Sequence, residues 1–176
     1  ESSAASDVYK RQLCDYYLDE PEPLDLAKDA AELDVHTLRP AHINTDEFIT
    51  AIGGLAPDYF IVANYQLRLG QRLLAVPSYD ALNFHPSPLP RYAGLAPFYW
   101  MAENHETQGG VSAVRTTAGL DEGPLVAQQL LALTGGETAR EIRDMHFAAS
   151  WRLFDLVLPT LLDRSYRTCL LYTSDA

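Results

Sequence analysis

The sequence is poor in cysteine and in positive charge, and it lacks long apolar runs. Its 176 residues include two cysteines, Cys14 and Cys169, which excludes a disulfide framework and a cysteine-based metal cluster. No apolar run approaches the length of a membrane-spanning helix. With 24 acidic and 13 basic residues the net charge is −11, which argues against a domain that grips nucleic-acid phosphates unaided. What remains is an acidic, cytoplasmic α/β domain, long enough for one sizeable core.

Both ends of the chain have features of sequence that does not belong to a fold. Residues 1–12, with the string DVYKRQ, and residues 169–176, CLLYTSDA, resemble translations of a transposase sequencing adapter. Neither end shows helical or strand periodicity, and segments of this kind are set aside before fold reasoning. We therefore expect residues 13–168 to be one domain, a fragment of a longer protein, flanked by two adapter-like artefacts.

Between these ends, apolar patterning predicts strands that alternate with helices. The continuous apolar run YFIVA is typical of a strand buried on both faces. Asn44 with Glu47, and Thr138 with Glu141, have the spacing of capping boxes that open helices. The alternation indicates an α/β fold with a doubly wound, mostly parallel sheet. The expected strands are 13–18, 35–38, 59–63, 81–84, 111–116 and 125–133, and the expected helices are 24–33, 44–52, 97–103 and 139–158.

Two polar segments interrupt this pattern where apolar runs end. They are residues 83–94, NFHPSPLPRYAG, and residues 119–124, GLDEGP. An open α/β sheet presents its chemistry outside the carboxyl ends of its strands. Asn83, His85 and Asp121 supply an amide, an imidazole and a carboxylate, which are the groups needed to polarise a carbonyl and manage protons around it.

Taken singly, each of these three residues has an ordinary structural interpretation. An asparagine before a turn often satisfies backbone groups, a histidine beside a proline is often a surface or core residue, and an aspartate in a glycine-containing turn is common turn chemistry. A metal site is not favoured, because asparagine is a poor zinc ligand and no cysteine or histidine stands at metal-binding spacing. The functional interpretation depends on finding the three together.

Together the two segments resemble the catalytic domain of the folate-dependent formyltransferases. The family pattern is Asn-x-His-Pro-Ser-x-Leu-Pro-x-Tyr-x-Gly followed by Leu-Asp-x-Gly, and the chain carries both parts, with Asp121 placed 38 positions after Asn83. This pattern is far more specific than a lone glycine-rich loop. The resemblance implies a Rossmann-like formyltransferase fold that lacks its first strand upstream of Leu13, which would leave neighbouring strand edges unpaired.

The resemblance also implies a reaction. A primary amine of the acceptor attacks the formyl carbon of 10-formyltetrahydrofolate and forms a tetrahedral intermediate. Asn83 is then the oxyanion donor, His85 stabilises charge or carries the amine proton, and Asp121 keeps the imidazole charged.

The same resemblance assigns the binding of the pterin ring to two loops. In the family this ring is held mainly by main-chain groups, so side-chain identity tests the assignment weakly. An ordinary loop between a strand and a helix is the alternative interpretation. The positions implied are Leu67, Leu69, Thr117 and Ala118.

Three functions fit these observations. The first is formyl transfer to a small amine or a sugar nucleotide. The second is hydrolysis of formyltetrahydrofolate, but those enzymes typically place a second histidine where this chain has Pro86. The third is a non-catalytic binding module, which is disfavoured because no member of the trio is degraded. Methionyl-tRNA is a less favoured acceptor, since a tRNA partner calls for basic surface.

Overall fold

The computed structural model describes residues 26–63, 65 and 67–171. The chain divides into two units, residues 1–41 and 42–176. In the first unit, helix α2 spans Leu26–Glu32, within the helix expected at 24–33. The strand expected at 13–18 lies outside the described residues.

The strand expected at 35–38 is wrong. This segment has no regular structure, and Val35 and Leu38 are 55% and 40% exposed. A short extended segment is stable as a strand only when a neighbour pairs with its N–H and C=O groups. None of the described strands pairs with this segment. A four-residue apolar run carries no information about whether such a neighbour exists, and this explains the error.

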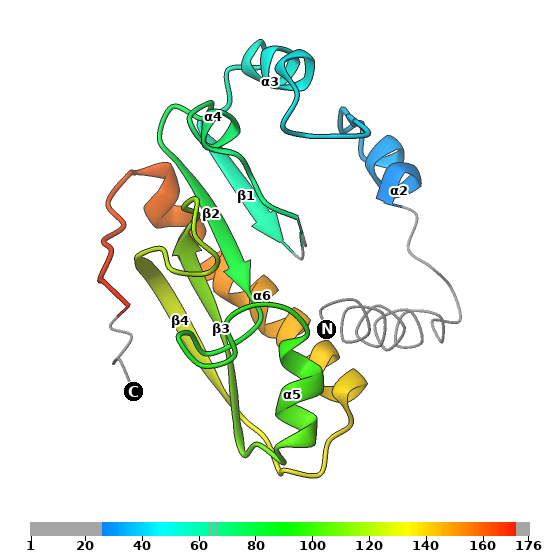
Figure 1. Cartoon of the computed structure of the whole chain (residues 1–176), viewed down its shortest axis with the longest axis vertical. Coiled ribbons are helices and arrows are strands. Elements are labelled where there is room, and N and C mark those ends of the chain that lie inside the picture. Colours follow the sequence, from blue (N-terminus) through cyan, green and yellow to red (C-terminus); the bar gives the residue numbers. More distant parts are fainter. Residues whose placement is uncertain (1–25, 64, 66, 172–176) are drawn as a thin grey trace, which may run out of the picture. The chain divides into compact units, whose positions relative to one another are not determined.

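The second unit is built on a four-stranded sheet with the order β1-β2-β3-β4 (Figure 1). Its strands are β1 (Tyr59–Ala63), β2 (Asp80–His85), β3 (Gln108–Arg115) and β4 (Leu125–Ala132). Strands β1 and β2 are parallel, whereas β3 is antiparallel to both β2 and β4. The α/β class is as expected. Among the four described strands the sheet is mixed, with a parallel pair of β1 and β2 and two antiparallel pairs in which β3 takes part.

Helix α6 (Ala139–Leu162) covers one face of this sheet and contacts β2, β3 and β4 (Figure 1). Helix α5 (Pro97–Glu103) packs against α6, and the shorter helices are α3 (Asp46–Gly53) and α4 (Gln71–Leu74). The core between α6 and the sheet consists of Leu82, Phe84, Val111, Ala113, Ala149, Leu153, Val157 and Leu161. Leu82 and Phe84 therefore face α6, and strand alternation directs Asn83 and His85 to the opposite face.

One of the two expected capping boxes is present. Thr138 accepts from the backbone N–H of Glu141, whose side chain in turn accepts from the backbone of Thr138. The helix continues to Leu162, beyond the expected end at 158, and includes Pro159, whose carbonyl accepts from the N–H of Asp163.

The box expected at Asn44 and Glu47 is wrong, since Thr45 is the N-cap of α3 and accepts from the N–H of Phe48. The side chain of Asn44 instead bridges a distant loop, donating to the carbonyl of Arg68 at 2.9 Å and accepting from the N–H of Gly70 at 2.7 Å. An amide group can donate and accept at once, which favours this bridge between two backbone groups.

His146 is a buried histidine at the contact between α6 and β3. Its Nδ1 lies 2.7 Å from the carbonyl of Ile142, and its Nε2 accepts from the N–H of Gly110 at 3.0 Å. The ring is fully buried, and a Cβ at Gly109 would lie 2.5 Å from it. These contacts require the neutral ring, and burial lowers the pKa of His146 below its ordinary value.

The stability of the protein should therefore fall as the pH decreases below about 6.5, the ordinary pKa of histidine. The unfolded chain binds a proton at this position that the folded chain excludes. The free energy of unfolding therefore decreases by up to about 1.4 kcal/mol for each pH unit that the pH falls. Urea unfolding between pH 7.5 and 5.5 measures the slope, which His146→Gln should flatten. The control is His42→Gln at an exposed position, which should keep the wild-type slope. An equal slope in His146→Gln and the wild type would contradict this account.

Candidate active site

Asn83, His85 and Asp121 come together at the carboxyl end of β2. The amide nitrogen of Asn83 donates to Oδ1 of Asp121 at 3.3 Å, and Nδ1 of His85 lies 3.4 Å from Oδ2 of the same carboxylate. Asn83 and His85 share one face of β2, while Asp121 arrives from the loop between β3 and β4. Two segments that are distant in sequence thus form one polar cluster.

The carboxylate of Asp121 is the centre of this cluster. Its side chain is 6% exposed, and it has a left-handed backbone with φ 53°. The backbone N–H of Gly94, which has φ 92°, donates to Oδ2 at 2.9 Å. With the amide of Asn83 and the imidazole of His85, this makes three partners for one buried charge. Such compensation is what allows a carboxylate to stay ionised away from water.

Both ring nitrogens of His85 face acceptors. Nε2 lies 3.0 Å from the carbonyl oxygen of Tyr92, and Nδ1 faces Asp121. A neutral imidazole carries one N–H and could satisfy only one of these acceptors, whereas the imidazolium donates at both nitrogens. The arrangement therefore fits a cationic ring held between a carbonyl and a carboxylate.

A buried hydrogen-bond network holds the loop that follows His85. The hydroxyl of Ser112 donates to the carbonyl of Ser87 at 2.7 Å and accepts from the N–H of Leu89 at 3.0 Å. The side chain of Gln128 adds bonds of 2.9 Å to the carbonyl of Leu89 and to the Ser112 hydroxyl. The Leu89–Pro90 peptide bond in this loop is cis. Side chains of β3 and β4 thus hold the backbone of this loop by hydrogen bonds.

The positions assigned to the pterin fall on two loops that touch each other. Leu67 is 72% exposed, Leu69 is half-buried, and Thr117 and Ala118 are exposed. The guanidinium of Arg68 donates to the carbonyl of Ala118 at 3.0 Å and joins the two loops. No signal in the sequence singles out this arginine, because its partner is a backbone group of a loop 50 positions away.

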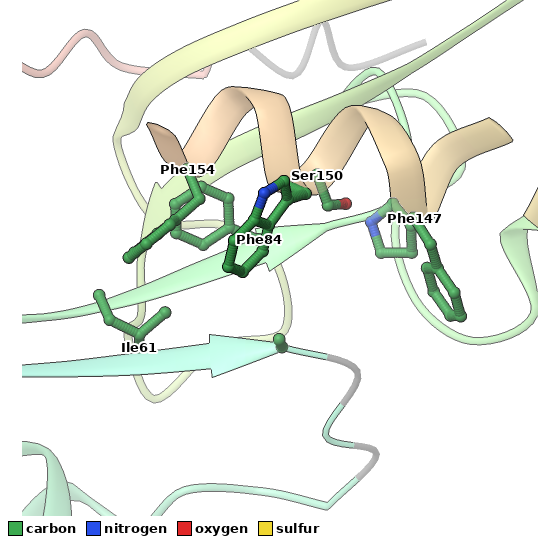
Figure 2. Close-up of a pocket in the computed structure, with 8 residues that line it drawn as sticks. Ile61, Phe84, Phe147, Ser150 and Phe154 are labelled. Carbon is green, nitrogen blue, oxygen red and sulfur yellow. The ribbon is translucent and has the colours of Figure 1, made fainter. Parts of the chain in front are cut away.

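An apolar groove lies on the other face of β2 (Figure 2). Its volume is about 360 Å³, and Ile61 on β1 and Phe154 on α6 stand on facing sides of it. Phe84, between Asn83 and His85 in sequence, is part of its wall, so the groove and the polar cluster lie on opposite faces of one strand. The lining residues are Ile61, Ala63, Phe84, Pro86, Phe147, Ser150, Trp151 and Phe154.

Within the described ranges, no group of three or more histidine, cysteine, aspartate or glutamate side chains is arranged to hold a metal ion. No helix in this part of the chain is long and apolar enough to cross a membrane.

The fold and the cluster together define an α/β domain with a polar site at the carboxyl end of a strand. The chain belongs to the formyl transferase family, whose sequence profile matches residues 14–156. A methionyl-tRNA formyltransferase from Geobacter sulfurreducens is 34% identical over 133 residues, which make up 76% of this chain and 42% of that protein. The chain thus spans less than half the length of this relative.

Solved structures of formyltransferases share the fold. A sugar 3N-formyl transferase, solved in the presence of dTDP and 5-N-formyl-THF, has a TM-score of 0.69 at 18% identity, covering 84% of this chain and 50% of that one. Glycinamide ribonucleotide transformylase 1 from Symbiobacterium toebii also has a TM-score of 0.69, at 23% identity, covering 82% and 74% of the two chains. At these identities the likeness concerns the fold alone.

Gly123 fixes the loop that delivers Asp121, and Gly123→Ala should displace it. A Cβ at Gly123 would lie 1.6 Å from the carbonyl oxygen of Arg115, a backbone group that cannot turn aside. We expect a loss of about 1–3 kcal/mol in the free energy of unfolding, together with an altered environment of Asp121. The matched control is Gly136→Ala, where the nearest atom is 3.7 Å away and little change is expected. Chemical denaturation compares the two variants, and equal stabilities would refute the close approach.

Proposed function

We propose that the protein containing this chain transfers a formyl group from 10-formyltetrahydrofolate to a primary amine. The convergence of Asn83 and His85 on the buried carboxylate of Asp121 is the observation that carries the proposal. Membership of the formyl transferase family supports it, as does the likeness of the fold to a sugar formyltransferase solved with 5-N-formyl-THF.

In the proposed reaction, the acceptor nitrogen forms a bond to the formyl carbon and the carbonyl oxygen becomes an oxyanion. Asn83 has two amide hydrogens, and one of them is directed to Asp121. The second is available to donate to the oxyanion, as an oxyanion-hole donor does. The bond from the formyl carbon to N10 of the folate then breaks, the acceptor nitrogen loses a proton, and tetrahydrofolate gains one.

His85 acts in this scheme as a fixed positive charge. Both of its nitrogens are engaged, by Tyr92 and by Asp121, so the ring stabilises the oxyanion electrostatically without giving up its own proton. The proton of the amine then passes through water bound at the carboxylate or through the substrates themselves.

We further propose that backbone groups of Leu67, Leu69, Thr117 and Ala118 bind the pterin ring. The hydrogen bond from Arg68 to the carbonyl of Ala118 supports this proposal, because it makes the two loops neighbours and so able to share one ligand.

For the acceptor we favour a small amine or an aminosugar nucleotide. With 24 acidic and 13 basic residues, this part of the protein has a net charge of −11, which does not favour the binding of a polyanion. Methionyl-tRNA is the main competitor, since the 34% identical relative is a methionyl-tRNA formyltransferase.

The test is an assay of the purified protein with 10-formyltetrahydrofolate and a panel of amines. The panel contains an aminosugar nucleotide, glycinamide ribonucleotide and methionyl-tRNA. Tetrahydrofolate released together with one formylated acceptor supports the proposal and identifies the acceptor. Formate released without any acceptor indicates a hydrolase, and folate binding without turnover indicates a binding module. Either of these outcomes overturns the proposal.

Asn83→Ala should lower kcat by about 10²–10³, because it removes the donor to the oxyanion. His85→Ala should lower kcat by a similar factor, because it removes the fixed charge. The affinity for 5-formyltetrahydrofolate should change little in both variants, since neither residue is assigned to the pterin. Steady-state kinetics and calorimetric titration separate these two effects. A variant that keeps kcat within threefold of the wild type would exclude the assigned role.

A further inference from the structure

The orientation of His85 depends on a backbone carbonyl held in an unusual conformation. The carbonyl of Tyr92 lies 3.0 Å from Nε2 of His85. Tyr92 has φ 57°, in the left-handed region that bulky side chains rarely adopt. A residue remains in that region only when its surroundings hold it there. The position of this carbonyl is therefore decided by whatever holds Tyr92.

The side chain of Tyr92 is held at its far end. Its phenol donates to Oε1 of Glu106 at 2.6 Å and accepts from the amide of Asn104 at 3.0 Å. The ring packs, partly buried, against the cluster that contains Phe98 and Met101. Glu106 lies two residues before the start of β3 at Gln108. The hydrogen bond of the phenol therefore connects the loop that carries Tyr92 to the beginning of this strand.

Arg91 completes this arrangement. Its guanidinium pairs with the same carboxylate oxygen of Glu106 that accepts from Tyr92. The hydrogen bonds from Arg91 and then Tyr92 lower the pKa of Glu106, which keeps it an ionised acceptor. Burial, followed by the bond to Glu106, raises the pKa of Tyr92, which keeps the phenol a donor.

We propose that Tyr92 and Glu106 are positioning residues for formyl transfer, which orient the imidazole of His85 through the carbonyl of Tyr92. The inference rests on the proposed function for its catalytic consequence only. Within the described residues, the side-chain hydrogen bonds of Tyr92 and Glu106 run to one another, to Arg91 and to Asn104, whereas the Tyr92 carbonyl reaches His85 in the cluster around Asp121. Their action is therefore indirect: without the phenol–carboxylate bond the left-handed backbone relaxes and the acceptor for Nε2 moves.

The first test compares Tyr92→Phe with Tyr166→Phe. Each variant loses one phenol, and each phenol donates to a carboxylate, Tyr92 to Glu106 and Tyr166 to Asp80. Asp80 and His85 stand at opposite ends of β2, roughly 16 Å apart along the strand. Both variants are expected to lose stability, but only Tyr92→Phe changes the geometry at His85.

The readout is the ring nitrogen resonances of His85, recorded by NMR. We expect Tyr92→Phe to shift these resonances and Tyr166→Phe to leave them at the wild-type positions. Unchanged resonances in Tyr92→Phe, or equal shifts in both variants, would overturn the inference. This measurement needs no turnover, so it stands whether or not formyl transfer is found.

Two substitutions of Glu106 provide a second test that does not alter Tyr92. Glu106→Gln retains an oxygen that can accept from the phenol, whereas Glu106→Ala does not. We expect the His85 resonances to be displaced in Glu106→Ala and largely restored in Glu106→Gln. An equal displacement of the His85 resonances in Glu106→Ala and Glu106→Gln would contradict positioning through the phenol.

In a protein that shows formyl transfer, Tyr92→Phe and Glu106→Ala should lower kcat by roughly tenfold or more and leave the KM for the folate nearly unchanged. A rise in KM alone would assign the two residues to folate binding and would refute the positioning role.

Discussion

The side chain of Asp121 carries a negative charge at 6% exposure, and the arrangement of the site follows from the need to compensate that charge. A buried carboxylate without partners is costly enough to take up a proton or to disrupt the fold. Here it receives an amide hydrogen from Asn83 and a backbone N–H from Gly94, and an imidazole nitrogen faces it. The charge therefore holds together the end of β2, the loop before α5 and the loop between β3 and β4.

The same requirement extends outward from the cluster. If His85 is to face Asp121 with one nitrogen, its other nitrogen needs an acceptor, and the carbonyl of Tyr92 provides it. That carbonyl requires a left-handed residue, which in turn requires an anchor at Glu106. Each polar group thus needs a partner, and the next residue of the network provides it. Buried networks of this kind are stable when every member is satisfied and costly when one is missing.

The elements that the sequence predicted well are those set by local chemistry. The proline at the start of α5 and the reciprocal cap at Thr138 each contain their own structural signal. The uninterrupted run at Tyr59–Ala63 forms the expected strand, but none of its five residues is buried and Ile61 is 43% exposed, so the expected burial on both faces is wrong for the sheet as described. The meeting of the two polar segments does not follow from the strand ends, because β3 is antiparallel to β2 and the carboxyl ends of the two strands point to opposite edges of the sheet. Asp121 reaches Asn83 and His85 through the course of the loop between β3 and β4, which the sequence pattern does not encode.

Features that depend on distant partners were not predictable. The side chain of Asn44 has the spacing of a helix cap, but the carbonyl of Arg68 and the N–H of Gly70 offer it two bonds that no local pattern reveals. The anchor between Tyr92 and Glu106 joins residues 14 positions apart that lie on either side of α5 in the sequence, so no local pattern reveals their contact. The prediction of a strand at 35–38 is wrong for a related reason. The segment has strand-like residues but no strand partner among the described strands.

The alternation along β2 places Leu82 and Phe84 toward α6, and Asn83 and His85 toward the polar cluster. Two faces with opposite requirements are therefore encoded by consecutive residues, and the register of β2 against β1 and β3 decides which face each residue occupies. A slip of one residue in the pairing of β2 would exchange the two sets, so that an amide and an imidazole would meet the apolar surface of α6. The pairing of β2 with its two neighbours therefore decides on which side of the sheet the polar cluster forms.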